Sequence, residues 1–548
     1  MSQHLPEQDI KDLRRFLRTQ SRGVLDQLTQ HETCFSSAEL QLALADLPTD
    51  ALPPHLHRIA AARMIRNPRL VTRLGDGSMT ATWLYKREKA LDKTARKLAA
   101  QSAPLVTPGA FRKAVIALDE HYKAEEQDPD PAYEAALKHL MSPGSLKLLA
   151  GPPGAHKSKM MHLLVEARRA SDPNRKSRVL VTADSDRVTS SLAEEVKAAG
   201  AILDTVLAEF KAGRSPLEKG GLLVVDEAAM LGTRRMANLL EGADAHGLNV
   251  ILIGDSQQMP PRTAGQPFRY LETIAPTAQL AQTWRQRQED ERQATLNLRD
   301  GDAASAVAVY ADKGRVRFAE KRKETLRATV DAYVERRINK LHSPRSMLMV
   351  GMTAKDATRM NKWVRKELIA ANVIGASQQV GITGGETLDL SMGDRVLIDE
   401  NITPEGHDRP VYAGSAGFVT RITGKWIDIM IDGKSPRAMR LSRAEELPLS
   451  HGYAIDLRRA QGLKADHTYI AVTQEMGPGA GLVAFSRHKR SARFFVNKKT
   501  FQSLPQFARA LTGNPHKTMA LDLPAPKAGI APDTPKADRR GEIRMFGL

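Results

Sequence analysis

Residues 146–164, LKLLAGPPGAHKSKMMHLL, combine residue types that bind phosphate with a spacing that lets them act together. The apolar run LKLL leads into a glycine-containing loop, which ends in a lysine and a serine at the start of a helical stretch. Backbone N–H groups and a helix N-terminus bind phosphate oxygens, the lysine adds a cation, and the serine hydroxyl is a ligand for Mg²⁺. The stretch therefore predicts a nucleotide-binding loop made of Gly151, Pro152, Pro153, Gly154, Ala155, His156, Lys157 and Ser158.

His156 departs from the usual form of such a loop, Gly, four residues, Gly, Lys, Ser or Thr, because it replaces the second glycine. That glycine commonly has a left-handed backbone, which costs a non-glycine residue on the order of 1 kcal/mol. Histidine tolerates this region better than most residues, and its imidazole can donate a hydrogen bond to phosphate. We therefore expect a weakened site that still binds nucleotide.

Two later apolar runs also end in polar residues that suit phosphate chemistry. The apolar strand in GLLVVDEAAM ends in Asp226 and Glu227. Asp226 can hold Mg²⁺, and Glu227 can activate the attacking water. LIGDSQQMPP places Gln258 where an amide can contact the γ-phosphate. An isolated Asp-Glu pair after a strand is usually a solvated turn, but its position after the phosphate loop favours the catalytic interpretation.

Two arginines complete the candidate set. Arg285 lies in LAQTWRQR and Arg487 in LVAFSRHKR, both in or beside a second α/β pattern. Arginines that reach a phosphate from another domain stabilise transition-state charge when a cleft closes. Either one alone is more commonly a surface salt-bridge residue.

Composition restricts the class of protein. The 548 residues carry 81 Lys plus Arg against 63 Asp plus Glu, a formal net charge of +18, which favours a polyanionic partner such as nucleic acid. Basic solvated faces on an ordinary protein are the alternative. The single cysteine, Cys34, excludes an internal disulfide framework and a cysteine-rich metal site. Because no signal-type or membrane-spanning apolar run is present, the sequence predicts a soluble cytoplasmic protein with no membrane partner.

The pattern of helical and strand-like segments along the chain predicts several domains. Helical patterns followed by strand-like runs around Asp76-Gly77 predict a helical, winged-helix-like domain, with Ser36 and Glu39 as a capping box. Short apolar runs that alternate with helices predict α/β domains with parallel sheets. The expected units are an N-terminal domain at 1–102, a first α/β domain at 103–275, a second at 276–515 with a small β-barrel insertion at about 385–445, and a disordered basic tail at 516–548.

The order of the motifs resembles superfamily 1B DNA helicases, the RecD-like class that includes the helicase portion of TraA- and TraI-type conjugative relaxases. VLVTAD resembles the first DNA-contacting motif, GYAIDLRRAQGLKADHTYIAV the segment around Gln461-Gly462, and LVAFSRHKR the segment of Arg487. MGDRVLIDEN and YAGSAGFVT resemble the barrel insertion, and the similarity covers about residues 20 to 510. The resemblance implies two RecA-like P-loop domains that hydrolyse ATP with Mg²⁺ and move along single-stranded DNA, 5′ to 3′.

The sequence also departs from that family. Tyr133 stands where a glutamine that reads adenine is expected, and Asp456 and Arg458 replace the Thr and His of the Gln-Gly segment. These changes predict loose nucleotide choice and put the coupling of hydrolysis to DNA movement in doubt. The histidines of HLH, residues 55–57, are interpreted as part of a loop before a helix rather than as the metal site of a nicking domain. A separate relaxase is therefore an expected partner.

Two hypotheses follow. In the first, the protein is an ATP-dependent DNA helicase or translocase in conjugation, mobile-element processing or repair, with catalytic residues Lys157, Glu227, Gln258, Arg285 and Arg487 and metal ligands Ser158 and Asp226. In the second, it is a degenerate scaffold that binds nucleotide and DNA with little turnover. The presence of every hydrolytic residue favours the first.

Overall fold

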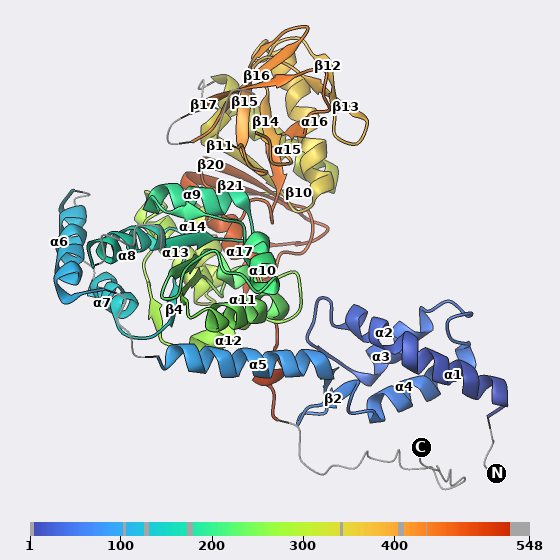
Figure 1. The fold of residues 1–548 in the computed structure, drawn as a ribbon. Coiled ribbons are helices and arrows are strands. Elements are labelled where there is room, and N and C mark those ends of the chain that lie inside the picture. The colour runs from blue at the N-terminus through green and yellow to red at the C-terminus, as the bar shows by residue number, and fades with distance from the viewer. Residues whose placement is uncertain are drawn as a thin grey trace.

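The computed structural model describes residues 5–101, 106–124, 131–171, 179–339, 344–403, 410–433, 436–513 and 515–525. Figure 1 shows a helical N-terminal unit, joined by one long helix to a central α/β domain, and a second α/β domain that carries an antiparallel unit. The predicted α/β fold with parallel sheets is confirmed. Within the described ranges, no helix has both the length and the apolar character needed to cross a membrane.

The first α/β domain contains a parallel sheet in the order β6-β5-β7-β8-β4-β9. Its strands are β4 (Leu146–Ala150), β5 (Val179–Thr182), β6 (Ala199–Gly200), β7 (Leu222–Val225), β8 (Asn249–Gly254) and β9 (Thr277–Gln279). Strands β4, β5, β7 and β8 are apolar runs buried along their whole length, as expected for a sheet covered on both faces. β9 pairs with β4, so this sheet continues past the boundary expected at residue 275.

Helices cover both faces of this sheet. One face packs against α6 (Pro108–Ala124), α7 (Pro131–Met141), α8 (Lys157–Ser171) and α9 (Asp186–Val196). The other packs against α5 (Thr82–Ala99), α10 (Leu203–Lys211), α11 (Thr233–Ala245) and α12 (Pro267–Ile274). The short 3₁₀ turn η3 (Ala228–Met230) follows β7.

The second α/β domain repeats this architecture with the sheet order β10-β21-β20-β11-β19, again parallel. Its strands are β10 (Val316–Ala319), β11 (Met347–Gly351), β19 (Ala454–Asp456), β20 (Ala465–Val472) and β21 (His488–Asn497). One face packs against α13 (Glu289–Arg299), α14 (Ala303–Asp312), α17 (Pro478–Phe485) and α18 (Leu504–Leu511). The other packs against α15 (Arg322–Asn339) and α16 (Ala354–Ala370), and η4 (Pro344–Ser346) leads into β11.

An antiparallel unit is inserted between β11 and β19. It has a five-stranded sheet in the order β17-β16-β15-β14-β18 and a separate hairpin, β12-β13. The strands are β12 (Gln378–Ile382), β13 (Glu386–Leu390), β14 (Arg395–Ile398), β15 (Ala416–Ile422), β16 (Trp426–Ile431), β17 (Arg437–Ser442) and β18 (Leu449–His451). The unit extends beyond both ends of the expected 385–445 range, and its closure into a barrel stays a prediction.

The N-terminal unit has its own apolar core. It contains α1 (Glu7–Thr19), α2 (Ser21–Leu28), β1 (Cys34–Phe35), α3 (Ser37–Ala45), η1 (Pro54–Leu56), α4 (His57–Arg66), β2 (Val71–Arg73) and β3 (Met79–Ala81). The predicted capping box at Ser36 and Glu39 is confirmed, and so is the hairpin turn, where Gly77 has a φ of 90°. Helix α5, assigned by sequence to this unit, extends into the core of the first α/β domain because Leu91, Ala95 and Leu98 pack there.

The expected disordered tail is corrected at its beginning. Residues 515–525, called here the strap, return from the end of the second α/β domain to the N-terminal unit and include η5 (Ala520–Asp522). Ala520 packs with Leu74 and Tyr85, and the backbone N–H of Leu521 donates to Glu88 Oε2 at 3.0 Å. The remainder of the expected tail, 526–548, lies outside the described residues.

Candidate nucleotide site between two parallel sheets

The predicted phosphate loop connects the buried strand β4 to helix α8. Gly154 has a φ of 87°, and a Cβ there would lie 2.6 Å from Arg285 Cβ, so the position accepts only glycine. A Cβ on Gly151 would lie 2.9 Å from Leu280 Cβ. The two glycines let the loop pass close to the segment that carries Arg285. Two hydrogen bonds hold that segment against the loop: Trp284 N donates to Gly154 O, and Thr283 Oγ1 donates to Pro153 O.

His156 has the left-handed backbone expected of the missing glycine, with a φ of 55°. Its ring stacks on Trp284, with ring centroids 6.2 Å apart and planes 13° apart, and meets the edge of Tyr133 at 6.4 Å. The hydroxyl of the buried Tyr133 donates to Ala155 O at 2.7 Å. The side chains of Trp284 and Tyr133 therefore hold His156 in its strained conformation. Tyr133 also stabilises the loop through its hydrogen bond to Ala155 O.

The ammonium of Lys157 lies across the loop and donates to Gly151 O at 2.6 Å and to Pro152 O at 3.0 Å. Burial lowers the pKa of Lys157, while the charges of Asp255, Glu227 and Asp226 act in the opposite direction. The lysine thus faces the carboxylates that follow β7 and β8.

Asp226 and Glu227 follow the last residue of β7. Burial, together with the neighbouring charge of Glu227, raises the pKa of Asp226 to about 7, although Asp226 Oδ1 accepts a 2.8 Å hydrogen bond from Glu227 N, which acts in the opposite direction. Glu227 itself has a φ of 49°, a strained conformation for a non-glycine residue. The two adjacent carboxylates that follow β7 and the Ser158 hydroxyl at the start of α8 are oxygen donors with excess negative charge, which fits a hard divalent cation such as Mg²⁺.

Gln258 is buried at the border of the two α/β domains. Its Nε2 donates to Asp255 Oδ2 at 3.3 Å, and Asp255 lies 3.7 Å from the guanidinium of Arg299, which belongs to α13. A Cβ on Gly479, in α17, would lie 2.8 Å from Gln258 O. Gln258 therefore contacts residues of both α/β domains.

The two predicted arginines are linked through Ser486. Arg285 Nη1 donates to Ser486 O at 2.9 Å, and burial lowers the pKa of Arg285 to about 10. Arg487 is 1% exposed and donates to carbonyls of its own domain at Val483, Ala460 and Leu463 and to Ser486 Oγ. Arg285 thus lies against the phosphate loop, whereas Arg487 is fixed within the second domain.

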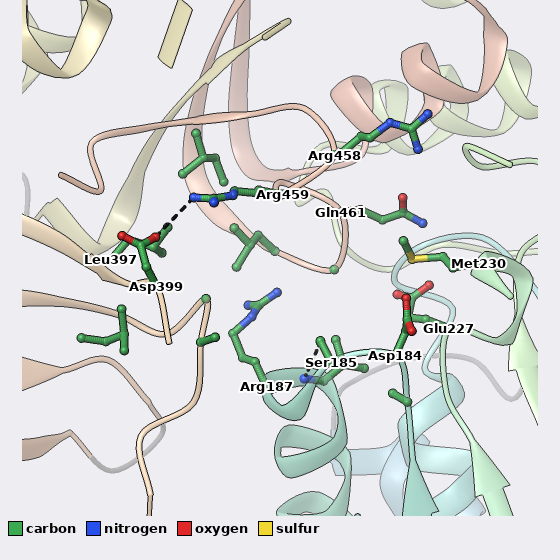
Figure 2. A pocket seen from close by; sticks show the side chains of 18 residues that line it. Asp184, Ser185, Arg187, Glu227, Met230, Leu397, Asp399, Arg458, Arg459 and Gln461 are labelled. Carbon is green, nitrogen blue, oxygen red and sulfur yellow. Dashed lines mark hydrogen bonds and ion pairs between the residues drawn. The ribbon is translucent and has the colours of Figure 1, made fainter. Parts of the chain in front are cut away.

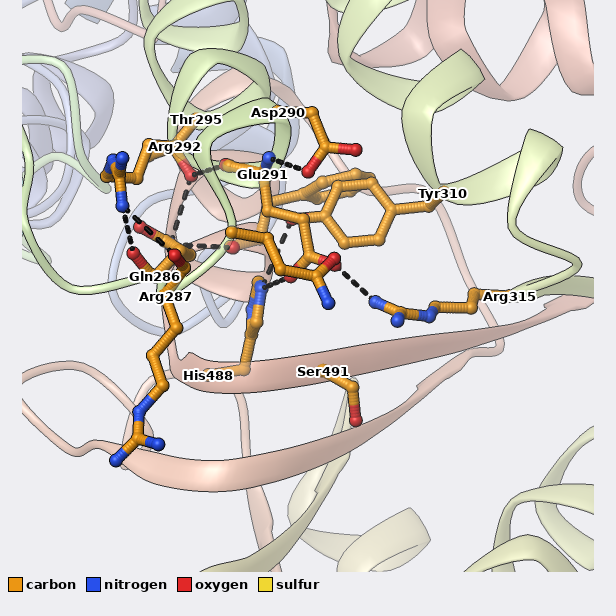
Figure 3. A network of polar contacts seen from close by, with 12 residues as sticks. Gln286, Arg287, Asp290, Glu291, Arg292, Thr295, Tyr310, Arg315, His488 and Ser491 are labelled. Atoms are coloured by element: carbon orange, nitrogen blue, oxygen red, sulfur yellow. Dashed lines mark hydrogen bonds and ion pairs between the residues drawn. The ribbon is translucent and has the colours of Figure 1, made fainter.

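A buried polar network fixes both arginine segments, and Figure 3 shows it around Glu291 and His488. His488 Nε2 lies 2.7 Å from Glu291 Oε2, and Glu291 also binds Lys313 at 3.1 Å and Arg315. Burial by itself raises the pKa of Glu291, but the hydrogen bond from His488 and the two cations outweigh burial and bring this pKa to about 2. Sequence reasoning missed this network.

A cavity of about 290 Å³ lies where the two α/β domains and the antiparallel unit meet. Figure 2 shows Asp184, Arg187 and Glu227 facing Arg458, Arg459 and Gln461 across it. Burial lowers the pKa of Arg187, and the charge of Glu227 opposes this shift. Gln461 Oε1 is buried and has no hydrogen-bond partner among the described residues. Arg187, three residues after VLVTAD, was not predicted, because nothing in the local pattern separates it from a solvated helix residue.

The histidines of HLH lie in the N-terminal unit, far along the chain from this site. His55 Nε2 is 3.0 Å from Asp9 Oδ2, and His57 Nε2 is 3.0 Å from Leu52 O. Among the described residues, no group of three or more His, Cys, Asp or Glu side chains is arranged to hold a metal.

Comparisons with known proteins agree with the motifs. A family model described as an AAA domain matches residues 130–321. Conjugal transfer protein TraA of Rhizobium radiobacter is 24% identical over 407 residues, which is 74% of this chain and 36% of that protein. The probable TraA of Sinorhizobium fredii is 22% identical over 94% of this chain and 46% of its own length. The ATP-dependent RecD2 DNA helicase of Deinococcus radiodurans is 29% identical over 245 residues, 44% of this chain and 31% of that protein.

The chain spans between 31% and 46% of the length of these curated relatives. Among solved structures, a Pif1 helicase structure at forked double-stranded DNA has 15% identity and a TM-score of 0.46, covering 69% of this chain and 94% of that one. The sequence relatives agree with the resemblance drawn from the motifs: the chain is similar to TraA conjugal transfer proteins and to a RecD2 DNA helicase.

Proposed function

We propose that this protein is an ATP-driven helicase or translocase that moves along single-stranded DNA, 5′ to 3′, in conjugative or other mobile-element DNA processing. The proposal rests on one observation: five residues expected to act on a phosphate lie close together between the two parallel sheets, namely Lys157, Asp226, Glu227, Gln258 and Arg285. The names of the TraA and RecD2 relatives support the DNA substrate, and a separate relaxase remains the expected partner.

The residues have distinct roles in this proposal. The N–H groups of the loop and the Lys157 ammonium bind the β- and γ-phosphates of ATP, in place of the loop carbonyls that Lys157 now contacts. Ser158 and Asp226 would hold Mg²⁺, which when bound neutralises charge on the phosphates. Glu227 accepts the proton of the attacking water, and Gln258 contacts the γ-phosphate.

The arginines act when the cleft closes. Arg285 lies beside the loop and stabilises charge on the transferred phosphoryl group, while Arg487 joins after exchanging carbonyl acceptors for phosphate oxygens. Movement of Gln258 and of the arginines then changes how the two RecA-like domains meet, and this change drives the DNA through the molecule.

One observation favours the alternative of a scaffold without useful turnover: Arg487 is buried and its guanidinium is already satisfied within its own domain. An arginine that never leaves those carbonyls cannot stabilise a transition state. The same experiment separates the two functions.

The deciding measurement is steady-state ATP hydrolysis with and without single-stranded DNA, on the parent, Lys157→Ala, His156→Gly and Lys159→Ala. Lys159 lies two residues further along α8 and is the matched control. We expect stimulation by DNA, a loss of at least about 100-fold in Lys157→Ala, and retained activity in the other two. An inert parent combined with an active His156→Gly would show that the histidine blocks turnover, in favour of the scaffold.

A further inference from the structure

The N-terminal unit has the connectivity of a winged helix. From α2 onward its elements follow as helix, strand, helix, helix, strand, strand, and the three strands form an antiparallel sheet in the order β1-β3-β2. Helices α3 and α4 pack together, and the β2-β3 hairpin turns at Asp76-Gly77. In helix-turn-helix proteins the second helix of such a pair enters the major groove of DNA.

Positive charge is concentrated on the second helix and the first hairpin strand. Between Pro54 and Gly75 the sequence contains no Asp or Glu and carries Arg58, Arg63, Arg66, Arg69 and Arg73, all of them exposed. By contrast, residues 7–46 contain the acidic residues Glu7, Asp9, Asp12, Asp26, Glu32, Glu39 and Asp46. The unit therefore carries a run of exposed arginines at residues 58–73, which we call the arginine face, whereas acidic residues outnumber basic ones at 7–46.

Helix α4 directs this charge outward. Its apolar residues Ala60, Ala61 and Met64 are buried, while Arg58 and Arg63 lie on the exposed side. Within the part of the chain that the structure describes, Arg58, Arg63, Arg69 and Arg73 form no ion pair with a carboxylate. Unpaired arginines so close together repel one another, and a polyanion relieves this repulsion.

Other surfaces of the unit are attached to the first α/β domain. Ala264 N donates to Gln30 O at 3.1 Å, and His31 Nδ1 lies 2.9 Å from Arg262 O. The strap adds a contact at the hairpin, where Gly75 N donates to Pro524 O at 2.8 Å and a Cβ on Gly75 would lie 2.7 Å from Pro524 Cβ. These contacts fix the unit in position and leave the arginine face exposed.

We propose that the arginine face is a binding site for double-stranded DNA, with Arg58 and Arg63 of α4 in the major groove and Arg69 and Arg73 on the phosphate backbone. The site is separate from the nucleotide cleft, so it does not depend on the proposed hydrolysis. Because the unit is fixed to the first α/β domain, duplex held there has a constant position relative to the motor.

The test measures DNA binding by fluorescence anisotropy without nucleotide, with a blunt duplex of about two helical turns and a single strand of the same length. The full chain is compared with Arg58→Ala/Arg63→Ala/Arg73→Ala and with Arg359→Ala/Lys362→Ala/Lys366→Ala. The second variant removes three exposed basic side chains from α16, in the other α/β domain, and matches the charge change. A third variant with Lys at 58, 63 and 73 keeps the charge.

We expect the alanine variant of the arginine face to bind duplex at least about tenfold more weakly at moderate salt, with a log–log salt slope smaller by about two to three. Single-strand affinity changes little, and the α16 variant and the lysine variant retain most duplex affinity. Equal losses in the α16 variant would mean that net charge alone is measured, and equal losses for the single strand would mean that the face is not a duplex site. Either result, or undiminished duplex binding, overturns the proposal whether or not the protein hydrolyses ATP.

Discussion

The carboxyl edge of the first parallel sheet and the amino edge of the second differ in how their charged groups are satisfied. In the first domain, Asp226 lies beside Glu227 and has a raised pKa, and among the described residues Lys157 donates its hydrogen bonds to loop carbonyls. In the second domain, Glu291 binds His488 and two cations, and its pKa is lowered to about 2. The same architecture thus carries one edge with unbalanced charge and one edge with paired charge.

Backbone strain follows the same division. His156 and Glu227, two of the non-glycine residues with positive φ, both lie at the edge of the first sheet. Lys197 and Asn372, which share this conformation, only terminate helices α9 and α16. Backbone strain and unbalanced charge are tolerated in a folded protein where a bound ligand compensates them. Paired charges instead hold side chains in fixed positions. The first edge is therefore suited to chemistry, and the second to positioning the arginines.

Removing the proposed base is expected to give the largest effect. Glu227→Gln keeps the size of the side chain and its strained backbone but cannot accept a proton, so DNA-stimulated hydrolysis should fall by roughly 10²–10⁴-fold. Binding of a fluorescent ATP analogue should persist, because the loop and Lys157 are unchanged. If Glu227→Gln hydrolyses ATP within a few-fold of the parent's rate, Glu227 is not the general base.

Breaking the paired edge should cost stability rather than chemistry alone. Glu291→Ala leaves His488, Lys313 and Arg315 without their shared acceptor, and losing one partner of a buried pair costs about 3–5 kcal/mol. Asp290→Asn is the matched control, because Asp290 also pairs with Lys313 but is 52% exposed, so its loss should cost less than about 1 kcal/mol. Denaturant unfolding measures both, and equal costs would contradict the role assigned to burial.

The same carboxylate predicts a dependence on pH. The folded pKa of Glu291 is about 2, below the value of an unfolded glutamate near 4.3, so the unfolded state takes up protons first as the pH falls. Its stabilising contribution is complete above about pH 4.3 and declines as the pH approaches 2. The stability difference between the parent and Glu291→Ala should therefore shrink over this interval.

The sequence predicted the features that depend on local pattern. Buried apolar runs such as those of β7 and β8 identified the parallel sheet, and the capping box at Ser36 and the turn at Gly77 follow from the residue types there. Polar residues after the same runs identified candidate site residues, because parallel strands end at one edge. The roles given to those residues remain predictions.

What the sequence did not reveal depends on contacts between distant segments. The packing of Trp284 on His156, and the carbonyl bonds of Arg487, join residues far apart in the chain that no periodicity relates. The strap was assigned to a disordered tail because it is proline-rich, yet its backbone groups find partners on α5 and the hairpin. β9 was separated from the first sheet because three residues carry too little pattern.

A smaller effect is expected from the support of the loop. Tyr133→Phe removes the hydroxyl that donates to Ala155 O but keeps the ring beside His156, so it costs about 1 kcal/mol of loop stability. Because in the proposed function the loop binds ATP in ground state and transition state alike, KM for ATP should rise several-fold with kcat nearly unchanged. A fall in kcat at constant KM would instead show that Tyr133 acts on the transition state.

A final prediction concerns Glu88, a buried carboxyl outside both edges. Burial raises its pKa to about 8, and its Oε2 accepts the 3.0 Å hydrogen bond from Leu521 of the strap. The folded state therefore holds a proton that the unfolded state releases near pH 4.3, so stability falls as the pH rises from there through 8. Glu88→Gln retains an acceptor for Leu521 without a charge, and its melting temperature relative to the parent should rise steadily between pH 5 and pH 9. A difference that stays constant over this range would mean that Glu88 is ionised in the folded protein, and that the strap binds a charged carboxylate as firmly as a neutral one.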